Sequence, residues 1–500
     1  MAVAGNGTGR EDDMAATGAG SSNGIELERI DRCRWRVPRR DGMRVEGRIF
    51  ANDALIEDIR GTEAARQVAN VAWLPGIVGH AIGMPDIHWG FGFPIGGVAA
   101  FDPAEGGVIS PGGVGYDINC GVRLLRAPLT ADDCGDHLRR LLDLIFRRVP
   151  AGLGRGYGSS SLRARDVRDL LEGGAEWAVE AGLGEPADLE RIEDGGRVAG
   201  ADAEAVSDRA IKRGREQVGT VGSGNHFIEI GHVDEVYDEA AAQRLGLERG
   251  TVTVLIHSGS RGLGHQVCDD FLVTMERAAE CHGIVLPDQQ LACAPLDSAA
   301  AADYLGAMRA AANYAYVNRQ AMAQQVRGCF REVLGEDAHL ELVYDVAHNI
   351  AKLERHRVGG EEREVCVHRK GATRAFPPGH PELPEGLRDL GQPVLLPGDM
   401  GRYSYVMLGT QGAFDETFGS CSHGAGRRLS RRQAKRAAEG RDLEAELAEL
   451  GIEVRASSMK TVAEELSEAY KDVADVVDVV AEAGIGRRVA RLRPMGVVKG

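Results

Sequence analysis

Three short segments decide the fold of this sequence: NHFIEIG (225–231), TVTVLIHSGS (251–260) and HLELVYDVAHN (339–349). Each is rich in β-branched, aromatic and aliphatic residues, which favours a strand. Each also carries one histidine: His226, His257 or His348. His257 and His348 stand where a strand gives way to a loop, a favoured place for ligands and catalytic groups. We therefore expect these distant segments to converge on one site.

The sequence around these segments predicts a single α+β domain. An amphipathic pattern predicts a helix over 131–150, closed by Pro150. A long Ala-rich helix is expected from an N-cap at Asp297 or Ser298 to about Leu334. No repeat or interdomain linker occurs. We predict one domain over residues 26–500, with central β-sheets, surrounding helices and a deep cleft for metal and nucleotide.

Composition limits the class of protein. No stretch approaches the roughly 20 apolar residues of a membrane span, and residues 1–25 read as a disordered tail rather than an export signal. Nine cysteines without a close CxxC pair do not form a disulfide framework, so we expect a cytoplasmic protein. The net charge of −16 argues against non-specific nucleic-acid binding. A dense basic run at 427–436 is either a solvated helix face or a local RNA-facing surface.

A mixed set of side chains suggests a metal centre. Asp117 and Cys120 lie three residues apart in the glycine-rich loop GYDINCG. With the three strand histidines they offer one sulfur, one carboxylate and three nitrogens. That exceeds the three protein ligands of a catalytic zinc site and suits two ions bridged by a thiolate. Such a set favours Mn²⁺, Zn²⁺ or Fe²⁺ over Mg²⁺ or Ca²⁺. Taken singly, a cysteine is more often a buried apolar residue, and a histidine is more often structural.

The segment SCSHGAGRR (420–428) is the strongest nucleotide-binding signal. The sequence contains neither GxxxxGK[ST] nor KxDG, and its GxG fragments lack the strand–GxGxxG–helix context of a Rossmann fold. His423 precedes Gly424, Ala425 and Gly426, and a helix is expected to begin directly after them. Backbone N–H groups at a helix start bind phosphate, and an imidazole can attack phosphorus. The alternative is a junction whose glycines merely allow a tight bend.

Seven segments together resemble a known family in their order and spacing. They are MPDIHWGFGFPIGGVAAFD, GGVISPGGVGYDINCGVRLLR, VGSGNHFIE, IHSGSRGLGH, DVAHN, PGDMGRYSYVMLGT and SCSHGAGR. The sequence is similar in them to the RtcB-type RNA-splicing ligases, and the similarity spans residues 26–500. The resemblance implies a single α+β domain with a polar cleft, two Mn²⁺ ions, and GTP as co-substrate.

The resemblance also implies site residues. One ion would be held by Asp117, Cys120 and His226, the other by Cys120, His257 and His348. His423 would carry GMP. The guanine nucleotide would be contacted by Asn225, His226, Phe227, Ile228, Glu229, His348, Asn349, Pro397, Gly398, Asp399, Met400, Ser404, His423, Gly424, Ala425, Gly426 and Lys499. Arg427, Arg431 and Arg432 are candidate RNA contacts. Lys499 reaches the site only if the C-terminal segment RPMGVVKG, which reads as a short tail, folds into it.

The implied reaction joins an RNA 3′-phosphate or 2′,3′-cyclic phosphate end to a 5′-hydroxyl end, in tRNA splicing or RNA repair. RNA is the expected partner, an activating protein partner is left open, and we expect a monomer. The alternative is a metal-dependent RNA end-processing hydrolase that does not ligate. Two features depart from expectation. Asp399 stands where the family typically has a small hydroxyl residue, and strict strand alternation places His226 and Glu229 on opposite faces.

Overall fold

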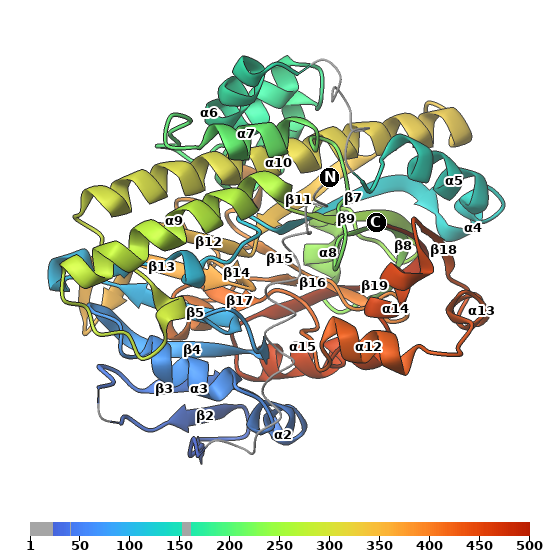
Figure 1. The fold of residues 1–500 in the computed structure, drawn as a ribbon. Coiled ribbons are helices and arrows are strands. Elements are labelled where there is room, and N and C mark those ends of the chain that lie inside the picture. Colours follow the sequence, from blue (N-terminus) through green and yellow to red (C-terminus); the bar gives the residue numbers. More distant parts are fainter. Residues whose placement is uncertain (1–23, 41, 153–161) are drawn as a thin grey trace.

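The computed structural model describes residues 24–40, 42–152 and 162–500. Residues 1–23 of the expected tail therefore lie outside the described residues. Two large sheets form the centre of the molecule (Figure 1). The seven-stranded sheet has the order β1 (Glu28–Arg29), β2 (Arg34–Val37), β3 (Gly47–Phe50), β4 (Ile77–His88), β5 (Ile95–Phe101), β13 (Glu361–Lys370) and β12 (Asn349–Val358).

The second sheet has eight strands, and most of the candidate metal ligands lie at or next to the ends of its strands. Its order is β11 (Glu341–Ala347), β7 (Gly121–Thr130), β9 (Thr251–Ser258), β8 (Phe227–Val236), β19 (Arg487–Lys499), β16 (Ser404–Leu408) and β15 (Pro393–Leu396), with β18 (Glu453–Ala456) parallel to β19. Two small sheets pair β6 (Val108–Ile109) with β10 (Ala294–Pro295), and β14 (Ala372–Arg374) with β17 (Ser420–Ser422). Most strand pairs are antiparallel, which confirms the α+β class.

Helices surround the sheets. They are α2 (Asp53–Arg60), α3 (Ala64–Val71), α4 (Ala131–Gly135), α5 (Leu138–Arg148), α6 (Ala164–Glu180), α7 (Asp208–Arg215), α8 (Glu239–Leu245), α9 (Arg261–Cys281), α10 (Ala299–Leu334), α11 (Gln411–Glu416), α12 (Arg431–Ala437), α13 (Leu443–Glu449), α14 (Met459–Glu464) and α15 (Val473–Glu482). Short 3₁₀ turns lie at Pro103–Glu105, Pro111–Gly113, Pro186–Arg191, Glu193–Gly196, Gln289–Leu291, Glu385–Leu387 and Ser467–Ala469. Among the described residues, no helix combines the length and apolar character that crossing a bilayer requires.

The long helix α10 confirms the expectation for residues 299–334. The hydroxyl of Ser298 accepts a hydrogen bond from the Ala301 amide at 3.2 Å, which caps the first turn. Most of α10 is buried, and its alanines combine high helix propensity with room for close neighbours. Figure 1 shows α9 and α10 side by side above the central strands. The helix thereby brings its buried polar residues to the backs of β7, β9 and β11.

Three local expectations are corrected. Residues 131–150 form two helices, α4 and α5, because Gly135 weakens the pattern at their junction. The segment after Gly426 does not open a helix: α12 begins at Arg431, where Ser430 and Gln433 form a capping box. The expected helix N-terminus directly after His423 is therefore not formed by this segment. The C-terminal segment is the long strand β19, which pairs with β8 and β16.

Candidate active site

A cavity of about 880 Å³ lies where the two large sheets meet the loops between their strands. Segments from all over the chain line it. They include His88 at the end of β4, Asp117 and Cys120 before β7, Asn225 and His226 before β8, His257 near the end of β9, His348 between β11 and β12, Pro397–Met400 after β15, His423–Arg428 after β17, and Lys499 at the end of β19. The expected cleft is therefore present and is formed by residues distant in sequence.

Strand register brings the metal candidates together. Gly121 pairs with Ala347 on one side and with Ser258 on the other, and His257 pairs with Phe227. The ends of β11, β7, β9 and β8 are thus adjacent, and the residues just beyond them face one point. The Cys120 carbonyl also accepts a hydrogen bond from the His348 amide at 2.9 Å. The sheet itself therefore sets the spacing of these side chains.

Five side chains form two overlapping trios that share Cys120: Asp117, Cys120 and His226, and Cys120, His257 and His348. The Cys120 Sγ lies 3.4 Å from His226 Nε2 and 3.3 Å from His257 Nε2. His226 Nε2 lies 2.9 Å from Asp117 Oδ2, and the Nε2 atoms of His257 and His348 are 3.4 Å apart. Two ligand atoms bound tetrahedrally to one ion, each about 2.1 Å from it, are about 3.4 Å apart. The spacing therefore fits metal ions between these atoms.

The charge states of these groups also fit a metal centre. Burial lowers the pKa of His257 and His348 well below the usual value, so both imidazoles are neutral and can act as ligands. Although burial raises the pKa of Asp117, the hydrogen bond and charge of His226 lower it on balance, so the carboxylate is ionised. Burial, followed by the Asp117 charge, raises the pKa of Cys120 well above the usual value. A cation in contact with the sulfur would reverse that shift and hold the thiolate.

His423 lies beside this cluster and is held by a residue that the sequence analysis missed. Its ring is 5.0 Å from the His348 ring, centroid to centroid. The buried Asp86 carboxylate accepts a hydrogen bond from the His423 amide at 2.9 Å and bonds to Nδ1 of the same side chain. Burial raises the pKa of Asp86, but the charge and hydrogen bonds of His423 lower it on balance, so Asp86 is an acceptor. In the neutral ring, Nδ1 therefore carries the proton and Nε2 has the lone pair.

Lys471 supports the strand segment that carries Asp86. Its ammonium donates to the carbonyls of Pro85 and Ile87, and burial lowers its pKa to about 8. The sequence signal for this arrangement was the motif MPDIHWG, in which a carboxylate and His88 lie two residues apart among Pro and Gly. A carboxylate in such a motif deserved the same weight as the strand histidines. Arg261, His265 and Lys370 also line the cavity and were not singled out.

Most of the expected nucleotide contacts line the cavity. Those that do are Asn225, His226, Phe227, His348, Asn349, Pro397, Gly398, Asp399, Met400, His423, Gly424, Ala425, Gly426 and Lys499. Three others are not among the described lining residues: Ile228 and Glu229 are buried in β8, and the Ser404 hydroxyl accepts a hydrogen bond from the Gly398 amide at 3.3 Å. His226 precedes the first residue of β8, so strand alternation does not require His226 and Glu229 to point to opposite faces of the sheet.

Two carboxyl groups influence each other here: Asp399 lines the cavity, and Glu229 is buried in β8. Burial, and then the charge of Asp399, raise the pKa of Glu229 to about 8. Asp399 accepts hydrogen bonds at Oδ1 from the Gly401 amide and the Ser467 hydroxyl. Its Oδ2 is buried without a hydrogen-bond partner among the described residues, and Arg402 Nε lies 3.6 Å away. Burial also raises the pKa of Asp399. A ligand with N–H donors would satisfy these acceptors.

The basic run divides into anchored and exposed members. Arg427 donates to Glu465 at 3.0 Å, and Arg431 Nε lies 3.6 Å from a Glu464 oxygen; both arginines line the cavity. Arg432 is exposed and is not among the described lining residues. Lys499 Nζ is 3.8 Å from Glu465, so this carboxylate joins the end of β19 to the basic run.

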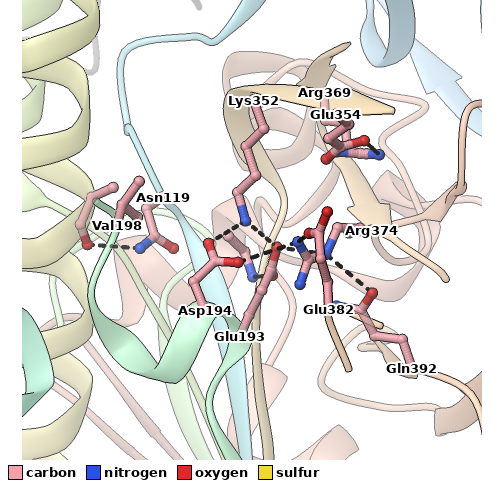
Figure 2. Close-up of polar contacts among 12 residues, drawn as sticks. Asn119, Glu193, Asp194, Val198, Lys352, Glu354, Arg369, Arg374, Glu382 and Gln392 are labelled. Atoms are coloured by element: carbon pink, nitrogen blue, oxygen red, sulfur yellow. Dashed lines mark hydrogen bonds and ion pairs between the residues drawn. The ribbon is translucent and has the colours of Figure 1, made fainter. Parts of the chain in front are cut away.

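A buried ion network lies next to the end of β11 (Figure 2). Lys352 and Arg374 converge on Glu193 and Asp194, and the Glu193 carboxylate accepts a hydrogen bond from the Ala347 amide at 2.9 Å. Ala347 is the residue before His348. Because buried charges are stable only when paired and hydrogen bonded, this network fixes the end of β11 in one position.

Comparisons with known proteins identify one family. A family model described as "tRNA-splicing ligase RtcB" matches residues 67–500. The tRNA-splicing ligase RtcB of Thermococcus kodakarensis is 54% identical over 480 residues, which cover 95% of this chain and 99% of the relative. That of Archaeoglobus fulgidus is 52% identical over 479 residues, covering 95% and 99%.

A bacterial relative extends the similarity. The RNA-splicing ligase RtcB of Mycobacterium tuberculosis is 52% identical over 436 residues, which cover 87% of this chain and 100% of the relative. These matches confirm the resemblance drawn from the seven sequence motifs. With the sheet architecture and a cavity that gathers those motifs, they establish that the chain belongs to the RtcB family of tRNA-splicing ligases.

Proposed function

We propose that this ligase joins RNA 3′-phosphate or 2′,3′-cyclic phosphate ends to 5′-hydroxyl ends, using GTP and forming a GMP adduct on His423. One observation carries the proposal. The His423 imidazole lines the same cavity as two cysteine-sharing ligand trios and lies 5.0 Å from the ring of His348. A nucleophile next to two cation sites suits attack on a polyphosphate, whose negative charge must be offset.

In the first step His423 Nε2 attacks the α-phosphorus of GTP. A P–N bond forms, the bond from the α-phosphorus to its bridging oxygen breaks, and pyrophosphate leaves. Asp86 holds the ring by its Nδ1 proton, so the lone pair on Nε2 is directed to the cavity. The carboxylate also stabilises the positive charge that develops on the imidazole during attack.

The two trios would hold two divalent ions, for which we propose Mn²⁺: one by Asp117, Cys120 and His226, the other by Cys120, His257 and His348. Bound there, the ions supply Lewis-acid stabilisation of phosphate oxygens. The mixed sulfur, nitrogen and oxygen set supports a transition metal rather than Mg²⁺ or Ca²⁺.

The remaining steps transfer GMP to RNA. Water opens a 2′,3′-cyclic phosphate to a 3′-phosphate, and an oxygen of that phosphate attacks the phosphorus on His423. The P–N bond breaks and an RNA 3′-end activated with GMP forms. The 5′-hydroxyl of the second RNA then attacks the 3′-phosphorus, GMP leaves, and a phosphodiester remains. The exposed Arg432, with Arg427 and Arg431 at the cavity, supports an RNA path along the basic run.

We expect Asp86→Asn to slow guanylation by about 10²- to 10⁴-fold, because an amide has no charge to stabilise the developing imidazolium and its NH2 group can enforce the other tautomer. Single-turnover transfer of label from α-labelled GTP measures the rate. Asp102→Asn is the matched control, since Asp102 is also buried but is not among the described residues that line the cavity. A rate for Asp86→Asn within threefold of wild type would show that the carboxylate does not position His423.

Guanine recognition should depend on pH through Glu229. The N1 and N2 donors of guanine bind the ionised carboxylate, so affinity rises as pH passes the Glu229 pKa of about 8. Removing the Asp399 charge in Asp399→Ser lowers that pKa, and GMP binding at pH 7 should tighten about three- to tenfold. Calorimetric titration with GMP between pH 6 and 9 measures this, with AMP as the control ligand. An unchanged midpoint in Asp399→Ser would contradict the assignment.

Several finer properties belong to the same proposal. All nine cysteines are free thiols, which supports a reducing compartment such as the cytoplasm. We propose action as a monomer in tRNA splicing or RNA repair, with an activating protein as a further partner.

Incubation with α-labelled GTP and Mn²⁺, followed by addition of 3′-phosphate and 5′-hydroxyl oligonucleotides, tests the central claim. Acid-labile protein label followed by joined RNA is expected. Cyclic-phosphate opening without GTP, label or joining would instead identify an end-processing hydrolase.

A further inference from the structure

Arg319 is a fully buried guanidinium on α10, directly behind the strands that present Cys120, His257 and His348. We infer that Arg319 is the positioning residue that assembles this trio by bonding to the chain beside each of its members. The inference rests on the proposed metal centre and assigns to it a part on α10 that touches neither ion nor substrate.

Every N–H group of the Arg319 guanidinium has a partner. Nη1 donates to the carbonyls of Asn119 and Ser258, both at 2.9 Å. Nη2 donates to Asn119 Oδ1 at 3.1 Å and to Asp345 Oδ1 at 2.8 Å. Nε donates to Asp345 with 3.0 Å to each carboxylate oxygen. One rigid, planar group thus joins three separate segments.

The three partners lie in the chain segments that carry the three candidate ligands. Asn119 precedes Cys120, Ser258 follows His257, and Asp345 lies three residues before His348 on β11. The loop that precedes His226 is hydrogen bonded to Asn318, the residue before Arg319 on α10, instead of to Arg319. The Asn318 amide oxygen accepts from the Gly219 amide at 2.8 Å and from the Thr220 amide at 3.2 Å. The hydrogen bonds of Arg319 therefore hold the segments that carry Cys120, His257 and His348.

The backbone at this point needs external support. Asn119 has a φ of +51°, a left-handed conformation that is uncommon outside glycine and that asparagine tolerates better than most residues. Arg319 donates hydrogen bonds to both the backbone carbonyl and the side-chain oxygen of Asn119. The Asn119 side-chain Nδ2 donates to the Ala312 carbonyl at 2.7 Å. The turn that aims Cys120 at the histidines is therefore stabilised from α10.

The Arg319 guanidinium also packs closely against the backbone at Gly121. A Cβ at Gly121 would lie 2.5 Å from the Val346 carbonyl oxygen and 3.0 Å from the Arg319 guanidinium carbon. The guanidinium therefore packs against the backbone of β7 immediately after Cys120. A lysine in this position offers three donors from a single nitrogen, so it cannot reach Asn119, Ser258 and Asp345 together.

Titration of the metal-free, full-length chain with Co²⁺ tests the inference, with thiolate-to-Co²⁺ charge-transfer absorbance and equilibrium dialysis as readouts. We expect Arg319→Lys to weaken Co²⁺ binding at the trio of Cys120, His257 and His348 by 10- to 100-fold, the loss typical of groups that orient metal ligands. The other trio shares only Cys120 with it and should be weakened less. Arg327→Lys is the matched control, because Arg327 is also buried on α10 but pairs with Asp188 and contacts neither Asn119, Ser258 nor Asp345. It should bind Co²⁺ as the wild type does.

A second variant covers the case in which Arg319→Lys does not fold. Asn119→Gly keeps the left-handed backbone accessible but removes the Asn119 side-chain acceptor of Nη2, and should weaken Co²⁺ binding by about three- to tenfold. Binding of both ions within twofold of wild type by Arg319→Lys, or by Asn119→Gly where the lysine variant does not fold, overturns the role of Arg319. A wild-type chain without a thiolate–Co²⁺ band overturns the proposed metal centre itself.

Discussion

His423→Ala should form no covalent GMP adduct and join no RNA, a loss of at least about 10⁴-fold in rate, as expected for removal of a nucleophile. The change leaves Asp86 without its Nδ1 partner but removes no metal candidate. Because His423 lines the cavity and is not part of the apolar core, the folded state should survive. The measurement is acid-labile label on the protein after incubation with α-labelled GTP and Mn²⁺.

The same variant separates the two candidate activities. A ligase that works through His423 loses GTP-dependent joining but keeps Co²⁺ binding, since both ligand trios remain. A hydrolase that uses only the ions would keep cyclic-phosphate opening at the wild-type rate. His282→Ala is the control, because His282 is exposed and is not among the described lining residues of the cavity. Persistent protein label in His423→Ala would place the GMP on another residue.

Cys120→Ala should abolish guanylation by at least about 10³-fold and reduce Co²⁺ binding from two ions toward none. Cys120 is common to both trios, so its removal takes a ligand from each ion at once. The negative thiolate that would lie between the two ions and offset their mutual repulsion is also lost. Cys120→Ser should behave alike, since an un-ionised hydroxyl is a poor substitute for a thiolate.

Equilibrium dialysis and the charge-transfer absorbance of Co²⁺ measure the loss, and single-turnover guanylation measures its consequence. Cys293→Ala is the control, because Cys293 is a buried free thiol in the apolar core and outside both trios. Retention of two ions with full guanylation in Cys120→Ala would exclude a bridging role for the sulfur.

The sequence predicted local features correctly where a few neighbouring residues specify them, as at strand ends and helix caps. His257 and His348 were expected at strand ends and lie there, and Ser298 was one of two expected caps of α10 and caps it. The expectation of a helix after Gly426 was wrong, because a capping box at Ser430 decides where α12 begins. The glycines at 424 and 426 serve a turn, in which a Cβ at Gly426 would lie 2.1 Å from the Asp86 carbonyl oxygen.

Partners far apart in sequence could not be found in this way. Asp86 and His423 are 337 residues apart, and Arg319 is 200 residues from Asn119. Neither Asp86 nor Arg319 has a periodic or motif signal that names its partner, because a buried ion pair is defined by the register of strands that meet only in the fold.

The sequence by itself determined the α+β class, the strand-end histidines, the long alanine-rich helix and the family motifs, because each depends on propensity and side-chain chemistry within a short window. Only the tertiary structure decided that Asp86 orients His423, that Arg319 lies behind the ligand loops, and that the C-terminal segment is a strand bringing Lys499 to the cavity. The physical reason is that burial and hydrogen-bond satisfaction belong to the packed assembly of sheets and helices. No segment can specify them alone.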